Sequence, residues 1–206
     1  MTVALSYGRD RAWKRRLVAL AAPRRGERAL DVACGTGDLA GAVAAHGIRV
    51  VGLDVTARMI AIARRPPSAG GLAGFVRADM MSLPFGDRQF DLVTSGYGLR
   101  NAPVLDTALR EMCRVLKPGG RLCTLDFDRP ANGLVRLVYL SYLTIVGSAW
   151  GLLLHGDPET YRYIPESIRT YPGSAAVIRL MKRCGFAEAR RVPVLGGLMA
   201  IHVAIK

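Results

Sequence analysis

Two carboxylates flank a short glycine-rich turn in the segment Asp31-Val-Ala-Cys-Gly-Thr-Gly-Asp38. A short apolar run precedes the turn and helix-forming residues follow it, which predicts a strand, a tight turn and a helix. In open α/β sheets a nucleotide-like ligand binds beyond the carboxyl end of such a strand, where glycine lets the backbone approach it closely. The segment therefore predicts a ligand site that includes Asp31, Gly35 and Gly37.

The charges of this segment bear on which ligand it binds. The spacing Gly35-x-Gly37-x-x-Ala40 also fits the dinucleotide-binding fingerprint, so spacing alone does not discriminate. A dinucleotide places its diphosphate at the helix N-terminus, where Asp31 and Asp38 would repel it. The same carboxylates suit an ammonium and a sulfonium, which S-adenosylmethionine carries without any phosphate. An ordinary strand–helix turn and a nicotinamide cofactor remain as alternatives.

Two later strands are also expected to end in aspartate. The apolar run 47–54 ends in Asp54, 19 residues after Gly35, where nucleotide-binding folds place a carboxylate on the ribose hydroxyls. The run 74–79 ends in Asp79, which is expected to contact the adenine amino group while Met80 packs on the ring. With Asp31 and Asp38 these carboxylates predict an acidic pocket, which again favours a cationic ligand.

The elements that must position these residues alternate along the chain. Strands are expected near 28–33, 47–54, 74–79, 90–95, 121–127, 186–192 and 198–205, with helices between most of them. This alternation predicts an α/β fold of the Rossmann-like, doubly wound type, with a mostly parallel seven-stranded sheet and an antiparallel C-terminal strand. An amphipathic helix within 6–20 is expected to cover the sheet or the ligand. The length of 206 residues suits one domain over 1–206.

The amino-acid composition indicates which binding partners suit this chain. The chain has 29 basic and 16 acidic residues, a net charge of +13, and half of its residues are hydrophobic. Such a charge suits RNA or an anionic membrane surface, and the basic runs are too short and dispersed to favour nucleic acid. The four cysteines form no metal-binding motif, so no metal site is expected. Reduced thiols and a polar N-terminus without a signal peptide predict a cytoplasmic protein.

Residues 137–154 carry no charge and are long enough to span a membrane. They lie between the fifth strand and the remaining strands of the same sheet, so both flanks must return to one domain. A buried core helix is one alternative. The preferred interpretation is a helical lid insertion over about 131–170 that covers a lipophilic substrate and meets an anionic membrane peripherally.

Five segments together carry a family resemblance: Asp31 to Asp38, Leu83-Pro84-Phe85, Tyr97-Gly98-Leu99-Arg100-Asn101, Arg114-Val-Leu-Lys-Pro-Gly-Gly120, and Tyr161 to Arg169. With them the chain resembles class I S-adenosylmethionine-dependent methyltransferases. More narrowly, it resembles the C-methyltransferases of ubiquinone and menaquinone biosynthesis. The resemblance implies methylation of a ring carbon of a prenylated quinol, either demethylmenaquinol or a ubiquinol precursor.

The resemblance also implies residue roles. Thr36, Asp54, Asp79 and Met80 would contact the cofactor, together with the backbone at Gly96, where the family commonly has serine. Arg100 and Asn101 would be catalytic. Since guanidinium stays protonated, Arg100 would stabilise a developing phenolate or position the water that takes the proton.

Substrate contacts by resemblance would come from Tyr161, Tyr163 and Arg169. Leu5-Ser6-Tyr7-Gly8 nearly opens the chain, where the family usually has a further segment, so substrate choice is expected to differ.

Four other functions stay open at this point. A methyltransferase of another lipophilic phenol or natural product would share every cofactor motif. An RNA methyltransferase would use the positive charge, and a nicotinamide-dependent oxidoreductase would use the glycine turn. A non-catalytic module would bind the cofactor without turnover. The expected partners are a lipophilic small molecule, an anionic membrane at its inner face and a second copy in a homodimer, with no nucleic acid.

Overall fold

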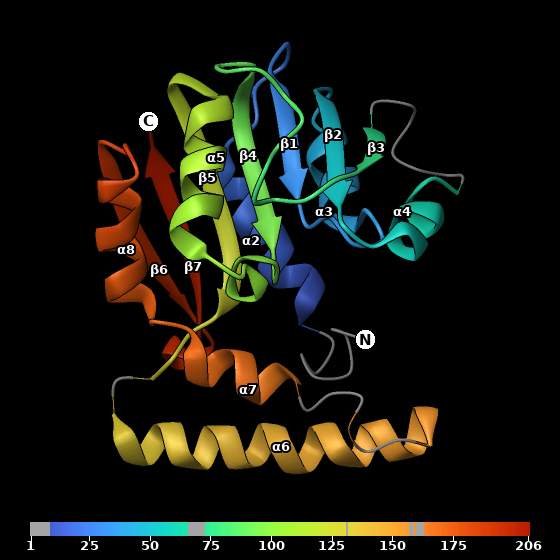
Figure 1. The fold of residues 1–206 in the computed structure, drawn as a ribbon, viewed down its shortest axis with the longest axis vertical. Coiled ribbons are helices and arrows are strands. Elements are labelled where there is room, and N and C mark those ends of the chain that lie inside the picture. The colour runs from blue at the N-terminus through green and yellow to red at the C-terminus, as the bar shows by residue number, and fades with distance from the viewer. Residues whose placement is uncertain (1–8, 66–72, 131, 157–158, 160–162) are drawn as a thin grey trace.

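The computed structural model describes residues 9–65, 73–130, 132–156, 159 and 163–206 (Figure 1). The helices and strands follow in the order α2 (Asp10–Ala21), β1 (Arg28–Val32), α3 (Asp38–Ala44), β2 (Arg49–Asp54), α4 (Ala57–Ala63), β3 (Ala73–Arg77), β4 (Phe90–Gly96), η2 (Leu99–Asn101), α5 (Leu105–Val115), β5 (Leu116–Phe127), α6 (Gly133–His155), α7 (Tyr163–Thr170), α8 (Ser174–Arg183), β6 (Glu188–Val194), η4 (Leu195–Gly197) and β7 (Met199–Ile205). Tyr161 and the segment 5–8 lie outside the described residues.

The strands form one seven-stranded sheet in the order β3-β2-β1-β4-β5-β7-β6. Strands β1 to β5 pair in parallel, and β7 runs antiparallel to both β5 and β6. Successive residues of a strand point to opposite faces, so Leu92 packs in the core on the α2 and α3 side and Val93 in the core on the α5 and α8 side. The predicted doubly wound sheet with an antiparallel C-terminal strand is confirmed.

Strand β5 differs from the expectation at its start. Lys117 to Gly120, which precede the expected strand 121–127, form an irregularity inside β5, because Phe90 pairs with Leu116 and Leu92 pairs with Arg121. The left-handed backbone of Gly119 (φ +73°) lets its N–H donate to the Lys206 carbonyl at 2.9 Å. The chain's last residue therefore stabilises this irregularity.

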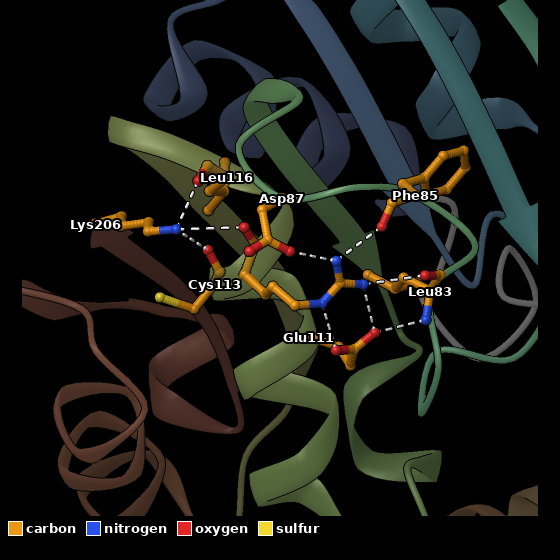
Figure 2. A network of polar contacts seen from close by, with 8 residues as sticks. Leu83, Phe85, Asp87, Glu111, Cys113, Leu116 and Lys206 are labelled. Carbon is orange, nitrogen blue, oxygen red and sulfur yellow. Dashed lines mark hydrogen bonds and ion pairs between the residues drawn. The ribbon is translucent and has the colours of Figure 1, made fainter.

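The amino-end edge of the sheet carries a polar network (Figure 2). The Arg114 guanidinium donates to the Leu83 and Phe85 carbonyls at 3.1 and 2.8 Å and pairs with Glu111 and Asp87 at 2.7 and 2.9 Å. Glu111 in turn accepts the Leu83 N–H at 2.7 Å, and the Arg114 contact lowers the pKa of Glu111. The network fastens the connection between β3 and β4 onto α5.

The same edge is closed by the side chain of Lys206. Its ammonium donates to the carbonyls of Cys113 and Leu116, each at 2.7 Å, at the end of α5 (Figure 2). A cation at a helix C-terminus satisfies carbonyls that lack helical partners. Two segments that carry the family resemblance, Leu83 to Phe85 and Arg114 to Gly120, thus build the scaffold.

Helix α6 is bounded by two local signals. The Asn132 side chain caps it by accepting the N–H groups of Leu134 and Val135 at 2.9 and 3.2 Å, and Gly156 ends it in the left-handed conformation. Figure 1 shows α6 beyond α7, across the carboxyl ends of the strands. By length and composition α6 could cross a membrane. Only 22 % of an 18-residue apolar stretch of this helix is buried inside the protein. This low burial contradicts the alternative of a core helix.

We expect Arg114→Ala to lower the free energy of unfolding by about 2 kcal/mol, because it leaves a carboxylate and two carbonyls without their shared donor. Urea denaturation followed by circular dichroism measures the change. Arg110→Ala is the matched control on the same helix, since the exposed Arg110 pairs, among the described residues, with the half-buried Asp106 alone. Equal losses in the two variants would contradict a scaffolding role for Arg114.

Candidate functional site

The carboxyl ends of β2, β1 and β4 lie side by side in the sheet and bring most of the expected cofactor residues together. Asp31 lies in β1, Asp54 ends β2 and Gly96 ends β4, while the turn 33–37 connects β1 to α3. Strand β1 has β2 on one side and β4 on the other, which makes its carboxyl end the point where the chain order reverses. Ligands of open α/β sheets bind at this point.

The turn after β1 has an unusual backbone. Ala33, Gly35 and Gly37 have φ values of +55°, +54° and +84°, and such a value is rare for alanine. A side chain on Gly37 would lie 2.8 Å from the Phe75 ring, whereas the space beside Gly35 is open. Glycine is thus required on the packed side of the turn, and the other side leaves room for a ligand.

The amide groups of this turn are already engaged. The Gly35 N–H donates to Asp54 Oδ2 at 2.9 Å, and the Gly37 N–H donates to the Cys34 carbonyl at 2.9 Å. A dinucleotide diphosphate needs free amide donors at this position. The turn therefore favours a ligand without a phosphate group.

Asp31 is fully buried below the turn. Its Oδ1 accepts the Thr94 hydroxyl at 2.7 Å, while Oδ2 has no hydrogen-bond partner among the described residues. Burial raises the pKa of the Asp31 carboxyl to about 7. A buried acceptor without a donor is costly, and a ligand ammonium would satisfy it. The residues present therefore fit a cationic cofactor.

Asp54 and Asp79 differ in how they are held. Asp54 is buried, and its two oxygens accept the N–H groups of Gly35 and Thr56 at 2.9 and 2.8 Å. Each oxygen keeps a second lone pair for a ribose hydroxyl. Asp79 is exposed and accepts the Met81 N–H at 2.9 Å, while Met80 packs partly against the core. Both carboxylates are thus fixed by local backbone groups.

Helix α2 covers this edge through a buried carboxylate. Asp10 accepts the Tyr97 hydroxyl at 2.8 Å and pairs with Lys14 at 2.9 Å, and Lys14 also lies 3.5 Å from Asp38. Burial and the Asp10 carboxylate raise the pKa of Tyr97, so this phenol stays protonated. Sequence reasoning missed Asp10, whose only signal is an acidic residue beside the apolar face of an amphipathic helix.

The segment after β4 lies directly against the turn after β1. A side chain on Gly98 would lie 2.5 Å from the Ala33 Cβ and 2.9 Å from the Ser95 hydroxyl, so only glycine permits this approach. The close packing holds η2 at the edge of the cofactor site. Arg100 and Asn101, the expected catalytic residues, both belong to η2.

Arg100 is buried in an ion pair. Its side chain is 4 % exposed, its Nε lies 3.0 Å from Asp126 Oδ1, and its backbone N–H donates to Asp126 Oδ2 at 3.0 Å. The guanidinium lies over the rings of Phe127 and Tyr163, at 5.2 and 5.7 Å from their centroids. Its Nη1 donates to the Ser167 hydroxyl and to Asn101 Oδ1. Asp126 was not predicted from the sequence, where it is only a polar residue near the end of an apolar strand.

The expected substrate residues are only partly brought together. Tyr163 packs on Arg100, and Asn101 is exposed with its amide donating to the Tyr97 carbonyl at 3.3 Å. Arg169 is exposed on α7 and makes no ion pair with any other residue that the structure describes. The structure thus groups Arg100, Asn101 and Tyr163 and leaves Arg169 apart.

We expect Arg100→Leu and Asp126→Leu each to lower the free energy of unfolding by roughly 3–5 kcal/mol, because each leaves a buried charge without its partner. The variant with both changes should lose clearly less than the sum, since it buries neither charge. Urea denaturation of the four proteins gives the coupling. Losses that simply add would show that the two residues act independently.

Comparisons with known proteins agree with this geometry. The family model of the ubiE/COQ5 methyltransferase family matches residues 1–206. A demethylmenaquinone methyltransferase of Thermus thermophilus is 44 % identical over 202 residues, which cover 97 % of this chain and 91 % of the relative. A ubiquinone/menaquinone biosynthesis C-methyltransferase of Azotobacter vinelandii is 39 % identical over 212 residues, which cover 100 % of this chain and 84 % of the relative.

Solved structures share the fold at low identity. A SAM-dependent methyltransferase from Aquifex aeolicus is 18 % identical with a TM-score of 0.67, covering 93 % of this chain and 88 % of that one. A SAM-dependent methyltransferase from Thermotoga maritima, titled a possible histamine N-methyltransferase, is 19 % identical with a TM-score of 0.65, covering 100 % and 97 %. The chain belongs to the ubiE/COQ5 methyltransferase family and is an S-adenosylmethionine-dependent methyltransferase.

Proposed function

We propose that the enzyme methylates a ring carbon of a prenylated quinol, either demethylmenaquinol or a ubiquinol precursor. The observation that carries this proposal is the buried Arg100 guanidinium, held beside Asn101 and Tyr163 next to the cofactor edge. A phenolic ring with a long apolar tail needs one fixed cation for its hydroxyl and apolar surroundings for the tail. The names of the relatives from Thermus and Azotobacter point to the same class of acceptor.

The cofactor would be held at the carboxyl ends of β1, β2 and β4. Asp31 would accept its ammonium and Asp54 its ribose hydroxyls, while the other contacts would come from Gly35, Thr36, Gly37, Asp79, Met80 and Gly96. The free Oδ2 of Asp31 and the open space beside Gly35 support this assignment. When bound, S-adenosylmethionine supplies an electrophilic methyl group.

The protein's own residues would raise the electron density of the acceptor ring. Loss of the proton from a ring hydroxyl pushes density onto the neighbouring carbon, and the positive charge of Arg100 stabilises the developing phenolate. Asp126 pairs with the guanidinium at Nε, and Asn101 and Ser167 accept from Nη1, so these residues would hold the positive charge in place beside the ring hydroxyl. Asn101 would orient the ring.

The proton would leave through water. Burial raises the pKa of Tyr97 and of Tyr139, so neither phenol is a base near neutral pH. Arg100 is always charged and serves to position a water molecule rather than to accept the proton. The ring carbon that takes the methyl group would lose its hydrogen as a proton and the ring oxygen would regain one, so that one proton in all leaves through this water. The sulfonium–methyl bond breaks as the carbon–methyl bond forms, which leaves a neutral thioether.

The remaining assignments concern the surroundings of the site. We place one domain over 1–206, with the segment 131–170 as a lid that includes α6 and α7. Tyr161, Tyr163 and Arg169 would face the acceptor from this segment. The enzyme would act in the cytoplasm, peripheral to the inner face of an anionic membrane. We also propose a homodimer as its assembly.

We expect the purified protein with S-adenosylmethionine to convert reduced demethylmenaquinone into a product heavier by one methylene group, detected by mass spectrometry. Asn101→Ala should lower turnover on the order of tenfold or more, since a ring-orienting hydrogen bond is lost. Calorimetry should find its cofactor affinity unchanged. No methylated product from any prenylated quinol, with turnover on another phenol, would contradict the quinol assignment.

We expect the affinity for S-adenosylmethionine to fall roughly tenfold per pH unit between about pH 7 and 5, because binding then requires loss of a proton from Asp31. Asp31→Asn should bind weakly and show no such slope, while the exposed control Asp87→Asn should keep it. Calorimetry across this range measures both.

The stability of the free protein changes with pH in the opposite direction to the cofactor affinity. Because burial raises the pKa of Asp31, this group stabilises the fold at low pH, and its contribution is lost as the pH rises toward about 7.

A cofactor affinity that does not change between about pH 5 and 7 would remove Asp31 from the ammonium contact.

A further inference from the structure

Helix α6 presents a long apolar stripe to solvent. Its members are 60–74 % exposed and recur at spacings of three, four and seven residues, which places them on one side of the helix. They are Leu134, Leu137, Val138, Ile145, Leu152 and Leu153. From first to last the stripe is roughly 28 Å long, at 1.5 Å per residue. Large exposed apolar patches are uncommon on proteins that stay monomeric in water.

The opposite side of α6 is fastened to the domain. Tyr139, Leu140 and Leu143 are buried in the core that α2 and α3 share, and the Tyr139 hydroxyl donates to the Leu198 carbonyl at 3.3 Å. Figure 1 shows the helix lying lengthwise beneath α7. A helix that packs on the domain through these residues presents its opposite side to a membrane lengthwise.

A basic cavity adjoins the amino end of the stripe. It has a volume of about 460 Å³, and its lining includes Val135 of α6 together with Arg129, Arg136 and Arg191. Arg191 pairs with Asp128 at 3.1 Å, while Arg129 and Arg136 have no ion-pair partner within the described part of the chain. Two uncompensated cations beside an apolar stripe are complementary to an anionic group at the edge of an apolar phase.

We propose that α6 lies in the interfacial layer of an anionic phospholipid bilayer, with the stripe toward the acyl chains and a lipid phosphate in the arginine-lined cavity. This inference extends the membrane contact of the proposed function by naming its surface. An interfacial helix enters the bilayer by about 5–10 Å, so its inner side lies at the level of the phosphates. A second copy is the weaker occupant, because it would bring an equal net charge of +13.

The apolar half of the proposal is tested by flotation with vesicles of phosphatidylcholine and phosphatidylglycerol. The wild-type protein should float with them, and Ile145→Asp should weaken binding on the order of tenfold, because a charge then enters the apolar layer. The matched control is Ile62→Asp on α4, an exposed isoleucine that is outside the stripe. This control should bind like the wild type.

The contribution of the arginine-lined cavity is tested with the same vesicles and a second pair of variants. Replacing Arg129 and Arg136 by alanine should weaken binding roughly fivefold per arginine, and removing phosphatidylglycerol should have a similar effect on the wild type. The control replaces Arg24 and Arg25, which precede β1 at the opposite edge of the sheet, by alanine. It removes the same charge and should change binding much less.

Several results would overturn the proposal. They are no binding of the wild type to anionic vesicles, equal binding of all variants, and resistance to extraction by high salt and alkali as for a spanning helix. A stable dimer in sedimentation that Ile145→Asp dissociates would assign the stripe to a second copy. Turnover of a short-chain quinol in detergent is measured separately, so failure of membrane binding and failure of the proposed reaction are distinguishable.

Discussion

The buried pair of Arg100 and Asp126 is the interaction on which the site depends. Two charges taken out of water are stable only when each has its partner and further hydrogen bonds. Asp126 meets this need with the side chain and the backbone N–H of Arg100, and Ser167 and Asn101 accept from the guanidinium. Because these partners come from β5, η2 and α7, one ion pair fixes three elements relative to one another.

The carboxyl and amino ends of the parallel strands have different roles. At the carboxyl ends of the strands, Asp31, Asp54 and the turn between them form a cradle with unsatisfied or half-used acceptors. At the amino ends, Arg114 and Lys206 satisfy carbonyls and carboxylates around α5 (Figure 2). Segments typical of the family occur at both edges, so a typical segment is not by itself a functional one.

Helix α6 joins the site to the outside of the molecule. Its inner side packs with Tyr139 and Leu143 in the core, and its outer side leaves Ile145 and Leu152 in solvent. Burial of these residues would be favourable by about 25 cal/mol for each Å² of apolar surface removed from water. A partner with an apolar interior would supply that burial next to the site.

Much of the fold and of the cofactor edge follows from local sequence. The run before Asp31, the glycines of the turn and the aspartates that end later strands are short-range patterns, and parallel strands carry their ends to one edge whatever the rest of the chain does. This is why the order of strands and helices, and the meeting of Asp31 with Asp54, were predictable.

Tertiary structure alone decided the partners of the charged residues and the orientation of α6. Asp10 meets Tyr97 and Arg100 meets Asp126 and Ser167 across long stretches of chain, and many carboxylates could have been their partners. The apolar residues of α6 surround most of the helix, so no periodicity marks which side is buried. That choice is made by the surface that α7 and the core offer, and it leaves the apolar stripe facing outward.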